Sequence, residues 1–387
     1  MKRIREIVIR ELHLWGKRPI YLLGSVGVML ASAIFFLTFM SEGVPEDIPI
    51  GVVDRDLSST SRNFIRQLDA TQLGKVISFD NVSEARQEME AGRISAYVII
   101  PDNFDADVQA FRCPKMGIYV NTMNPVIGGA LAYKDILTMV SLTNGAVQRE
   151  VLRAKGVSER EIMARIQPFA IDAHYIGNAP ASYAYYLNNM ILTGILAMSI
   201  LLVVSYALAS ELKYGTSKEL LEMSGDSIGL AVFAKLIPYT LLFTVLGTTV
   251  QLVIFGPLHY PLRGSIWAML LATFLLVIAY EAIAVFIVSM VPTLRLSVCI
   301  SALYSVLGFS FAGFTLPISS LPAALRGLSW LYPLRFYYRI FVQVALFGTG
   351  FSGWWIFVVA LLAFQFLPLL GLKRLYGAYK YQNYPRN

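Results

Sequence analysis

Six apolar runs, each close to twenty residues long, constrain this sequence more than any other feature. They cover residues 19–40, 183–209, 228–255, 266–291, 297–316 and 354–372. About twenty apolar residues cross the hydrocarbon core of a bilayer as an α-helix, in which every backbone polar group is satisfied within the segment. Charged residues make up only 15% of the chain, against about 25% in soluble domains, so they are too few to cover a water-facing surface. The sequence therefore predicts a polytopic α-helical membrane protein with six transmembrane helices.

The first apolar run is predicted to remain as a span rather than to be cleaved as a signal peptide. Lys2, Arg3 and Arg5 precede it, and the small residues at 31–33 look like a cleavage site. The basic region is long for a signal peptide, however, and the apolar run continues past the small residues to Met40. We therefore expect an interfacial helix at residues 1–18 and a first span at 19–40. The interfacial helix is expected to be amphipathic and to lie in the membrane plane. Its apolar face would carry Ile4, Ile7, Val8, Leu12 and Trp15, and its polar face Arg3, Arg5, Glu6 and Arg10.

Basic residues in the short loops predict the orientation. Thirteen lie in the terminal segments and in the loops that six spans place on the same side, whereas four lie in the opposite short loops. Cytoplasmic loops carry the excess of lysine and arginine, so both termini are predicted to be cytoplasmic. The same distribution accounts for the net charge of +7 without nucleic acid as a partner. The long polar stretch 41–182 would then lie outside the cytoplasm, because long domains translocate regardless of charge.

Residues 41–182 are predicted to fold as a mixed α/β domain. Short β-branched runs at 48–53, 76–79, 95–100 and 117–121 indicate strands. Between and after them, helical patterns cover 60–68, 83–90 and 127–154. Strands that alternate with helices are typical of a layered α/β module.

The sequence holds no recognisable catalytic constellation or metal site. Asp54 and Asp56 follow the first predicted strand, where open α/β sheets often bind ligands, but a turn with a helix cap explains them better. Cys113 and Cys299 lie in segments of different character, so their pairing is not expected. The histidines are too scattered for a metal site. A phosphate-binding glycine loop, a nucleophile elbow and a zinc-protease motif are all absent from residues 41–182. We expect no cofactor bound by this chain.

The segment 210–227, after the second span, is predicted to contain a short capped helix on the cytoplasmic side. Gly215 suits a turn, and Thr216 or Ser217 suits the N-cap of a helix that carries Glu219 and Glu222. Its simplest interpretation is an ordinary polar loop beside a membrane. A more specific interpretation is a rigid helix that a partner protein binds and moves.

The order of several motifs resembles the ABC-2 type permeases, in particular the longer bacterial branch with a large domain after the first span. Members of that family have a motif in which an acidic residue is followed, after three residues, by Gly-Thr and an acidic helix. Glu211, Gly215 and Thr216 occupy the corresponding positions in this sequence. Further similar stretches are Arg10-Glu11-Leu12, Lys235-Leu236-Ile237-Pro238-Tyr239, and an outer re-entrant region at 312–350 that contains Gly313, Pro317, Pro322, Pro333 and Arg335. One departure is the turn at 292–296, where that branch often has a glutamine.

The resemblance implies an export complex in a bacterial inner (cytoplasmic) membrane. Two permease subunits, as a homodimer or a heterodimer, would enclose the pathway, and separate cytoplasmic ATPase subunits with their ATP and Mg²⁺ would act on Glu211, Gly215, Thr216, Glu219 and Glu222. A periplasmic adaptor and an outer-membrane channel are further partners in relatives with the large domain. The substrate would be hydrophobic or amphiphilic, such as a drug or a lipid.

Two charged residues fall inside predicted spans. Glu281 lies in the fourth run and Lys235 at a similar depth in the third, so we expect them to form a pair. Two interpretations of Glu281 remain open. It is either an acid that lines the substrate path or gate, or a structural residue that forms an ion pair or a protonated contact between packed helices. The aromatic residues at 330–338 are better explained by an aromatic belt at the headgroup level than by substrate binding.

Two other classes of function remain as alternatives. An ion-coupled secondary transporter would use Glu281 as its ion site and would predict two similar halves or matched interrupted spans, which the sequence does not show. A membrane-anchored sensor or enzyme would act through the outer domain, but it leaves five further spans unexplained.

Overall fold

The chain folds into two compact units in the computed structural model. Unit 1 comprises Met1–Gly43 and Tyr175–Asn387, and unit 2 comprises Val44–His174. The structure describes residues 2–41, 46–110, 112, 114–121, 129–167, 177, 182–314, 317–382 and 384. Of the positions used above, Cys113, residues 127 and 128 of the predicted helix at 127–154, and residues 315 and 316 of the predicted fifth span lie outside this set.

Unit 1 is helical and holds the apolar segments. Among the described residues, five helices are long and apolar enough to cross a membrane: Ile20–Phe39, Leu187–Lys213, Ile228–Phe255, Ile266–Met290 and Leu294–Phe311. Trp355–Leu370 and Leu372–Tyr381, bent by 42° against each other, would make a sixth if they form one broken span. The chain is therefore a multi-pass membrane protein with five or six spans.

The span boundaries agree with the sequence patterns except at the second and fifth spans. The helix of the second span continues past the apolar run to Lys213, and the fifth begins at Leu294 and ends at Phe311. The elements of unit 1 before residue 300 are α1 (Lys2–Lys17), α2 (Ile20–Leu22), a π-helical turn (Leu23–Gly27), α3 (Val28–Phe39), α9 (Tyr183–Lys213), α10 (Ser217–Ser224), α11 (Ile228–Phe255), α12 (Ile266–Met290) and α13 (Leu294–Phe311). The later ones are α14 (Ala323–Leu328), α15 (Pro333–Phe341), α16 (Trp355–Ala363), α17 (Leu372–Tyr381) and short 3-10 or π turns at Ile318–Ser320, Ser329–Leu331, Val342–Leu346, Phe351–Gly353 and Phe364–Leu370.

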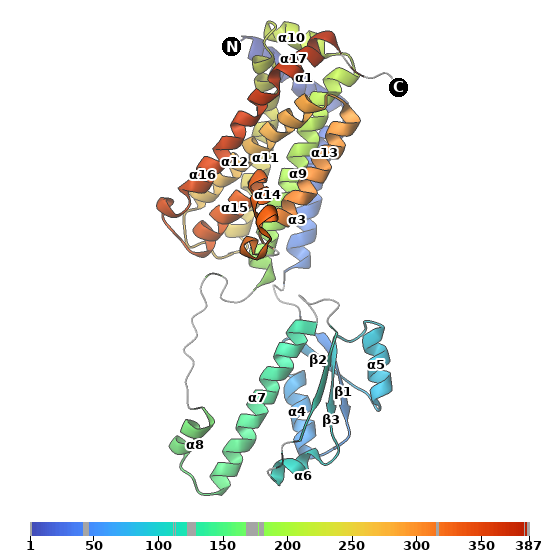
Figure 1. Ribbon diagram of the computed structural model, residues 1–387, viewed down its shortest axis with the longest axis vertical. Helices are drawn as coiled ribbons and strands as arrows, with labels where there is room; N and C mark the ends of the chain where they lie inside the picture. Colours follow the sequence, from blue (N-terminus) through green and yellow to red (C-terminus); the bar gives the residue numbers. More distant parts are fainter. Residues whose placement is uncertain are drawn as a thin grey trace. The chain divides into compact units, whose positions relative to one another are not determined.

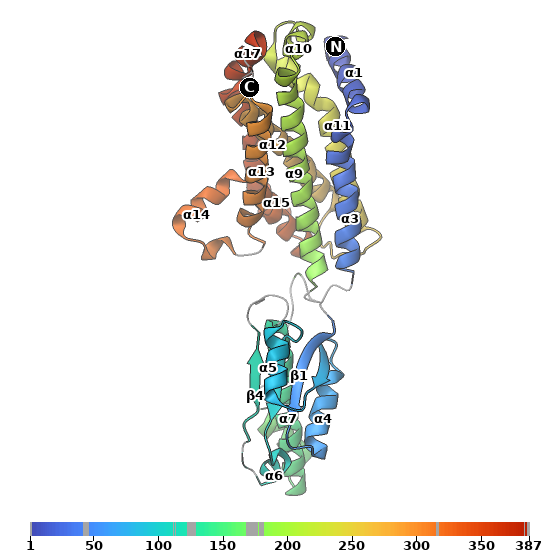
Figure 2. The same ribbon diagram turned by 90° about the vertical axis from the view of Figure 1, so that its right-hand side faces the viewer.

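Helices α9 and α12 form the centre of unit 1. They pack against each other, and α9 also contacts α3, α11 and α13. Because neighbours surround α12, its side chains are buried along most of its length and apolar on all faces. Helices α3 and α13 lie outside this centre and leave many apolar side chains exposed. Figures 1 and 2 show α1, α10 and α17 gathered at one end of the bundle.

Helix α1 only partly follows the predicted in-plane amphipathic pattern. Ile7 is buried against the bundle as expected, but Leu12 is 49% exposed. Arg10, expected on the polar face, points into the protein, and its neighbour Glu11 is fully buried. The deviation arises because α1 packs against α10 and α11 instead of lying free at an interface.

Unit 2 is a small α/β layer built on a four-stranded sheet in the order β2-β1-β3-β4. Strand β1 is parallel to both β2 and β3, and β4 is antiparallel to β3. The elements are β1 (Ile48–Asp54), α4 (Ser59–Asp69), β2 (Gly74–Ser78), α5 (Val82–Glu90), β3 (Ala96–Ile100), α6 (Phe104–Gln109), β4 (Gly117–Val120), α7 (Gly129–Ala154) and α8 (Glu159–Ile166). Helices α6 and α8 are the two that the sequence patterns did not indicate.

Alternation along the strands sets the layers of unit 2. Ile50 and Val52 of β1 pack with Phe64 of α4 and Ile136 of α7 on one face of the sheet. On the other face, Val53 belongs to a smaller cluster beneath α5. Figure 1 shows α4 and α7 beside the sheet.

Asp54 forms a turn, as the sequence predicts. Its Oδ1 accepts hydrogen bonds from the backbone N–H of Asp56 and Leu57, both at 3.1 Å, and its Oδ2 accepts from the Ser61 hydroxyl at 2.7 Å. No group of three or more possible metal ligands occurs among the residues that the structure describes.

Candidate functional site

The corner between α9 and α10 has the predicted turn but not the predicted cap. Gly215 has φ +74°, a left-handed conformation that glycine adopts without cost, and α10 starts two residues later. Thr216 has φ −96° and ψ 3°, outside the extended region that a capping side chain needs. Its hydroxyl donates instead to the Glu211 carboxylate, while the Ser217 hydroxyl donates to the Tyr379 carbonyl at 2.9 Å. The expected side-chain cap is therefore wrong.

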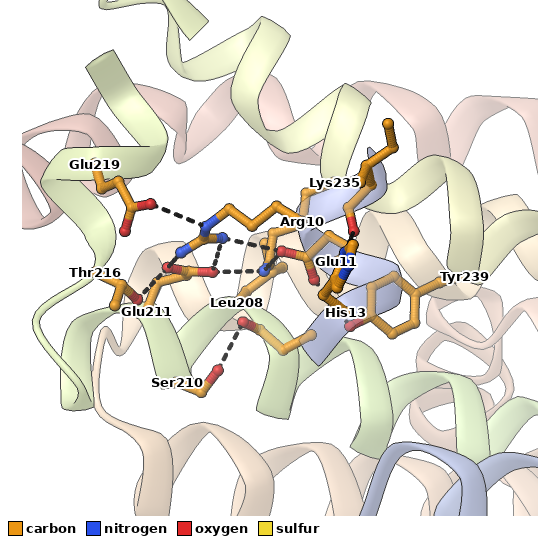
Figure 3. Close-up of polar contacts among 12 residues, drawn as sticks. Arg10, Glu11, His13, Leu208, Ser210, Glu211, Thr216, Glu219, Lys235 and Tyr239 are labelled. Atoms are coloured by element: carbon orange, nitrogen blue, oxygen red, sulfur yellow. Dashed lines mark hydrogen bonds and ion pairs between the residues drawn. The ribbon is translucent and has the colours of Figure 1, made fainter. Parts of the chain in front are cut away.

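Arg10 of α1 connects this corner to the N-terminal helix. Its two terminal nitrogens donate to the two oxygens of Glu211 at 2.8 and 2.9 Å, a bidentate pair (Figure 3). Its Nε lies 3.8 Å from the Glu219 carboxylate on α10. One guanidinium thus contacts the end of α9 and the exposed side of α10 together.

Lys235 of α11 joins the same group from the other side. Its Nζ donates to Glu11 Oε1 at 2.5 Å and to Glu211 Oε1 at 2.7 Å. The Tyr239 hydroxyl donates to the second oxygen of Glu11 at 3.1 Å, and the ring of Trp15 packs edge-on against Tyr239 with centroids 5.1 Å apart. Both Lys235 and Glu11 are 0% exposed.

These four side chains, Arg10, Glu11, Glu211 and Lys235, form what we term the ionic cluster. Two cations face two carboxylates, so the cluster is neutral as a unit, which buried charges require. Burial works against the charge of Arg10, but the hydrogen bond and charge of Glu211 and the charge of Glu11 outweigh it and raise the pKa of the guanidinium. The cluster links α1, α9 and α11 through their charges.

The C-terminal helix α17 supports the same end of the bundle. The Tyr379 hydroxyl donates to the Leu208 carbonyl of α9 at 2.8 Å, and its own carbonyl holds Ser217 at the start of α10. The Tyr376 hydroxyl donates to Asp226 at 2.8 Å, just beyond the end of α10. Helix α10 is therefore fixed at both ends to α17.

Comparison with known proteins decides the family. The sequence profile of the ABC-2 family transporter proteins matches residues 19–372, most of the chain. The chain belongs to the ABC-2 transporter family. It is 26% identical over 319 residues to the inner membrane transport permease YhhJ of Escherichia coli strain K12, with 79% of each chain covered. The protein of the same name from Shigella flexneri matches with the same identity and coverage.

Membership of the ABC-2 family defines the general role of the chain. It is a membrane subunit for transport, not the ATPase itself, and the family implies partner ABC ATPase subunits. The sequence agrees, because it contains no phosphate-binding loop of the type that nucleotide hydrolysis requires.

The predicted pair between Lys235 and Glu281 does not form in this ABC-2 protein. Lys235 faces α1 and α9, as described above. Glu281 of α12 contacts a different residue of α11, Thr240. Its Oε2 accepts a hydrogen bond from the Thr240 hydroxyl at 2.7 Å. Its Oε1 is buried and has no hydrogen-bond partner among the described residues. The two residues lie at a similar depth in adjacent helices, but their side chains do not face each other.

The acidic residues proposed for coupling fall into two groups. Glu211 is 1% exposed and belongs to the ionic cluster, so its contacts are with neighbouring side chains of the bundle. Glu219 and Glu222 are exposed on the outer face of α10, whereas Leu220 and Leu221 are buried beneath it. Helix α10 of the ABC-2 subunit therefore has one side fixed to the bundle and one exposed side that carries Glu219 and Glu222.

The region from 312 to 350 folds as short helices and turns. Gly313 has φ +91°, Pro317 precedes the 3-10 turn Ile318–Ser320, and Pro322 precedes α14. Pro333 is the first residue of α15, where the missing N–H costs nothing. The guanidinium of Arg335 lies 4.9 Å from the centre of the Trp330 ring.

The aromatic residues of this region do not form a simple belt. Trp330 is 57% exposed, as a belt residue would be, but Tyr332, Phe336 and Tyr337 are buried. The Tyr337 hydroxyl receives hydrogen bonds from Gln251 at 2.9 Å and Thr193 at 3.3 Å. The belt prediction is wrong for these three residues. Phe336 and Tyr337 belong to α15, which packs against the long helices, and Tyr332 just before it packs against Tyr304 and Phe311 of α13.

Sequence reasoning gave no role in the site to four residues, Arg10, Glu11, Tyr239 and Tyr379, of which the first three were named within motifs that resemble the family. A signal for Glu11 exists, since it follows Ile4 and Ile7 and precedes Trp15 on one face of α1. A carboxylate on an apolar face must find a buried partner. No comparable signal marks Tyr239 or Tyr379 in the sequence.

Proposed function

We propose that this ABC-2 protein is the permease subunit of an exporter in which a separate ATPase acts on α10. The observation that carries the proposal is the position of Arg10, which binds Glu211 and lies beside Glu219. ATP and Mg²⁺ would be bound by the ATPase subunits, and this chain would hold neither.

The first step is docking of the ATPase on α10. The buried side of this helix and its links to α17 fix it to the bundle. Its outer side presents Lys218, Glu219 and Glu222, all exposed, to a partner. Because α10 is fixed to the bundle, a partner that displaces α10 also displaces the helices attached to it. This supports a mechanical role for α10.

The second step is transmission through the ionic cluster. A displacement of α10 changes the contact between Glu219 and Arg10, and Arg10 is bound to Glu211 of α9. Lys235 extends the connection to α11 and, through Glu11, back to α1. An ATPase that binds one arrangement of these helices more tightly than another shifts the population between closed and open states.

The orientation and assembly complete the proposal. We place the α1, α10 and α17 end in the cytoplasm and unit 2 outside it, since the basic loops favour this direction. The relative from Escherichia coli is named an inner membrane permease, and we propose the same membrane here. A second permease copy or a paralogue would complete the path. A periplasmic adaptor and an outer-membrane channel would take over an amphiphilic substrate.

The test is purification of the full chain in mild detergent together with its ATPase. A charge reversal of the outer side of α10, Glu219→Lys with Glu222→Lys, should remove the ATPase and its nucleotide hydrolysis from the purified fraction. The matched control is Glu150→Lys in unit 2, an acidic side chain that is 75% exposed. Retention of the ATPase by the α10 variant at normal expression would refute docking at this helix, and proteolysis of α10 from the outer side would refute the orientation.

A further inference from the structure

A pocket of about 580 Å³ opens on the side of unit 1, away from the ionic cluster. Helices α12, α13 and α16, with the turns Ser329–Leu331 and Phe364–Leu370 and the start of α15, contribute its walls. The lining is aliphatic and aromatic and includes Phe286, Tyr304, Trp330, Phe336 and Phe364. The volume lies in the range of small-molecule sites, which is about 300–1,000 Å³. Such a wall suits a hydrocarbon chain.

The pocket is accessible and offers few polar groups. Trp330 and Leu331 at its edge are each 57% exposed. The hydroxyl of Tyr304 is already donated to the Leu331 carbonyl, so it is not free for a ligand. The lining therefore selects an apolar occupant.

The side chain of Arg335 lies beside two of the aromatic residues that line this pocket. The guanidinium of Arg335 lies 4.9 Å from the ring centre of Trp330 and 5.9 Å from that of Phe336, both of which line it. Its Nη1 donates to the Ser329 hydroxyl and to the Arg326 carbonyl. Burial, the larger cause, and the nearby charge of Arg339 lower the pKa of Arg335. The positive charges of Arg335 and Arg339 therefore lie close to each other.

No carboxylate among the described residues compensates these charges. Glu281 is the single acidic residue from position 227 to the C-terminus, and it is buried in α12. In the part of the chain that the structure describes, neither Arg326, Arg335 nor Arg339 forms an ion pair with a carboxylate. A guanidinium has five N–H donors, and among the described residues the hydrogen bonds of Arg335 come from one of its nitrogens, Nη1.

We propose that this pocket binds the acyl chain of an anionic membrane phospholipid, with its phosphate at Arg335 and Arg339. Basic pockets between membrane helices recognise such headgroups, and the apolar wall provides for the chain. The site is independent of the transport role proposed above, because it involves neither α10 nor the ionic cluster.

Quenching by brominated lipids tests the site in the full-length protein. The chain is reconstituted in phosphatidylcholine nanodiscs that contain a small share of lipid with brominated acyl chains. This brominated lipid is either phosphatidylglycerol or phosphatidylcholine. Trp330→Phe identifies the part of the emission that comes from the pocket among the five tryptophans. We expect the phosphatidylglycerol to quench this part at a clearly lower share than the phosphatidylcholine does.

Charge-neutral variants then test the headgroup. Arg335→Gln with Arg339→Gln should weaken the preference for phosphatidylglycerol by about fivefold for each arginine. Arg339→Gln alone removes an exposed side chain and keeps the test valid if the double variant folds poorly. Lys373→Gln with Arg374→Gln, two exposed charges on α17, is the matched control and should change nothing.

Three results would overturn the proposal. Equal quenching by both lipids would show that the headgroup is not selected. No quenching of Trp330 by either lipid would show that something else, such as a second copy of the chain, covers the pocket. A full preference retained by the arginine variants would remove the phosphate contact.

Discussion

Replacing Lys235 by methionine should strongly destabilise unit 1. At an effective dielectric of about 20, each of its two contacts contributes roughly 6 kcal/mol of attraction, before the cost of desolvating the ions. The net effect follows from what remains: Glu11 and Glu211 stay buried with only Arg10 to balance them. Removal of one partner from a buried ionic group typically costs about 3–5 kcal/mol, and we expect a loss in this range.

A second substitution isolates the electrostatic part of that loss. Glu11→Gln in the Lys235→Met background restores neutrality, because Arg10 and Glu211 then remain as a bidentate pair. The amide of the new glutamine still accepts the hydrogen bond of Tyr239. The double variant should therefore be more stable than Lys235→Met alone, although each single change is destabilising.

The assay is unfolding of the purified chain in mixed micelles by a denaturing detergent, followed by circular dichroism and tryptophan emission. The free energy of unfolding of each variant is compared with that of the exposed control Lys373→Met, which should lie within about 0.5 kcal/mol of the unmodified chain. A loss below about 1 kcal/mol for Lys235→Met, or simple addition of the two single effects in the double variant, would refute the ionic cluster as a coupled unit.

Other variants test the remaining contacts. Arg10→Lys should fold but lower the nucleotide hydrolysis that the transporter stimulates, because lysine cannot bind Glu211 in bidentate fashion; equal hydrolysis would contradict the link. Glu281→Gln should leave transport and stability unchanged or raise stability, since the amide removes a buried charge; lost transport at normal expression would make this acid functional. Gly215→Ala should cost about 1–2 kcal/mol because alanine must adopt φ +74°, as thermal unfolding would show against Gly229→Ala, a helical position with open space.

The membrane-embedded character and most elements follow from local patterns in the sequence. Apolar windows of spanning length can be satisfied only by helices, so Ile228–Phe255 and Ile266–Met290 were predictable to within a residue or two. The strands of unit 2 were predictable from alternation and β-branched residues. Helix α6 was missed because it has only six residues and too little periodicity to read.

The candidate site was predictable only in part. The turn at Gly215 depends on nearby backbone and is local, so the sequence indicates it. The pairing of Lys235 is not local, because it depends on which neighbour each side of α11 faces. Lys235 and Thr240 are five residues apart, which at 3.6 residues per turn places them about 140° apart around the helix. One therefore faces α1 and α9, while the other faces Glu281 on α12.

Sequence alone determined that the chain enters a membrane, where most of its long helices lie, and that charges within them need partners. These follow from composition and periodicity, which act within each segment. Only the tertiary structure decided that Arg10 and Glu11 pair with Glu211 and Lys235, residues about 200 positions away in the chain. Such pairing depends on the rotation and depth of packed helices, and no local pattern encodes either.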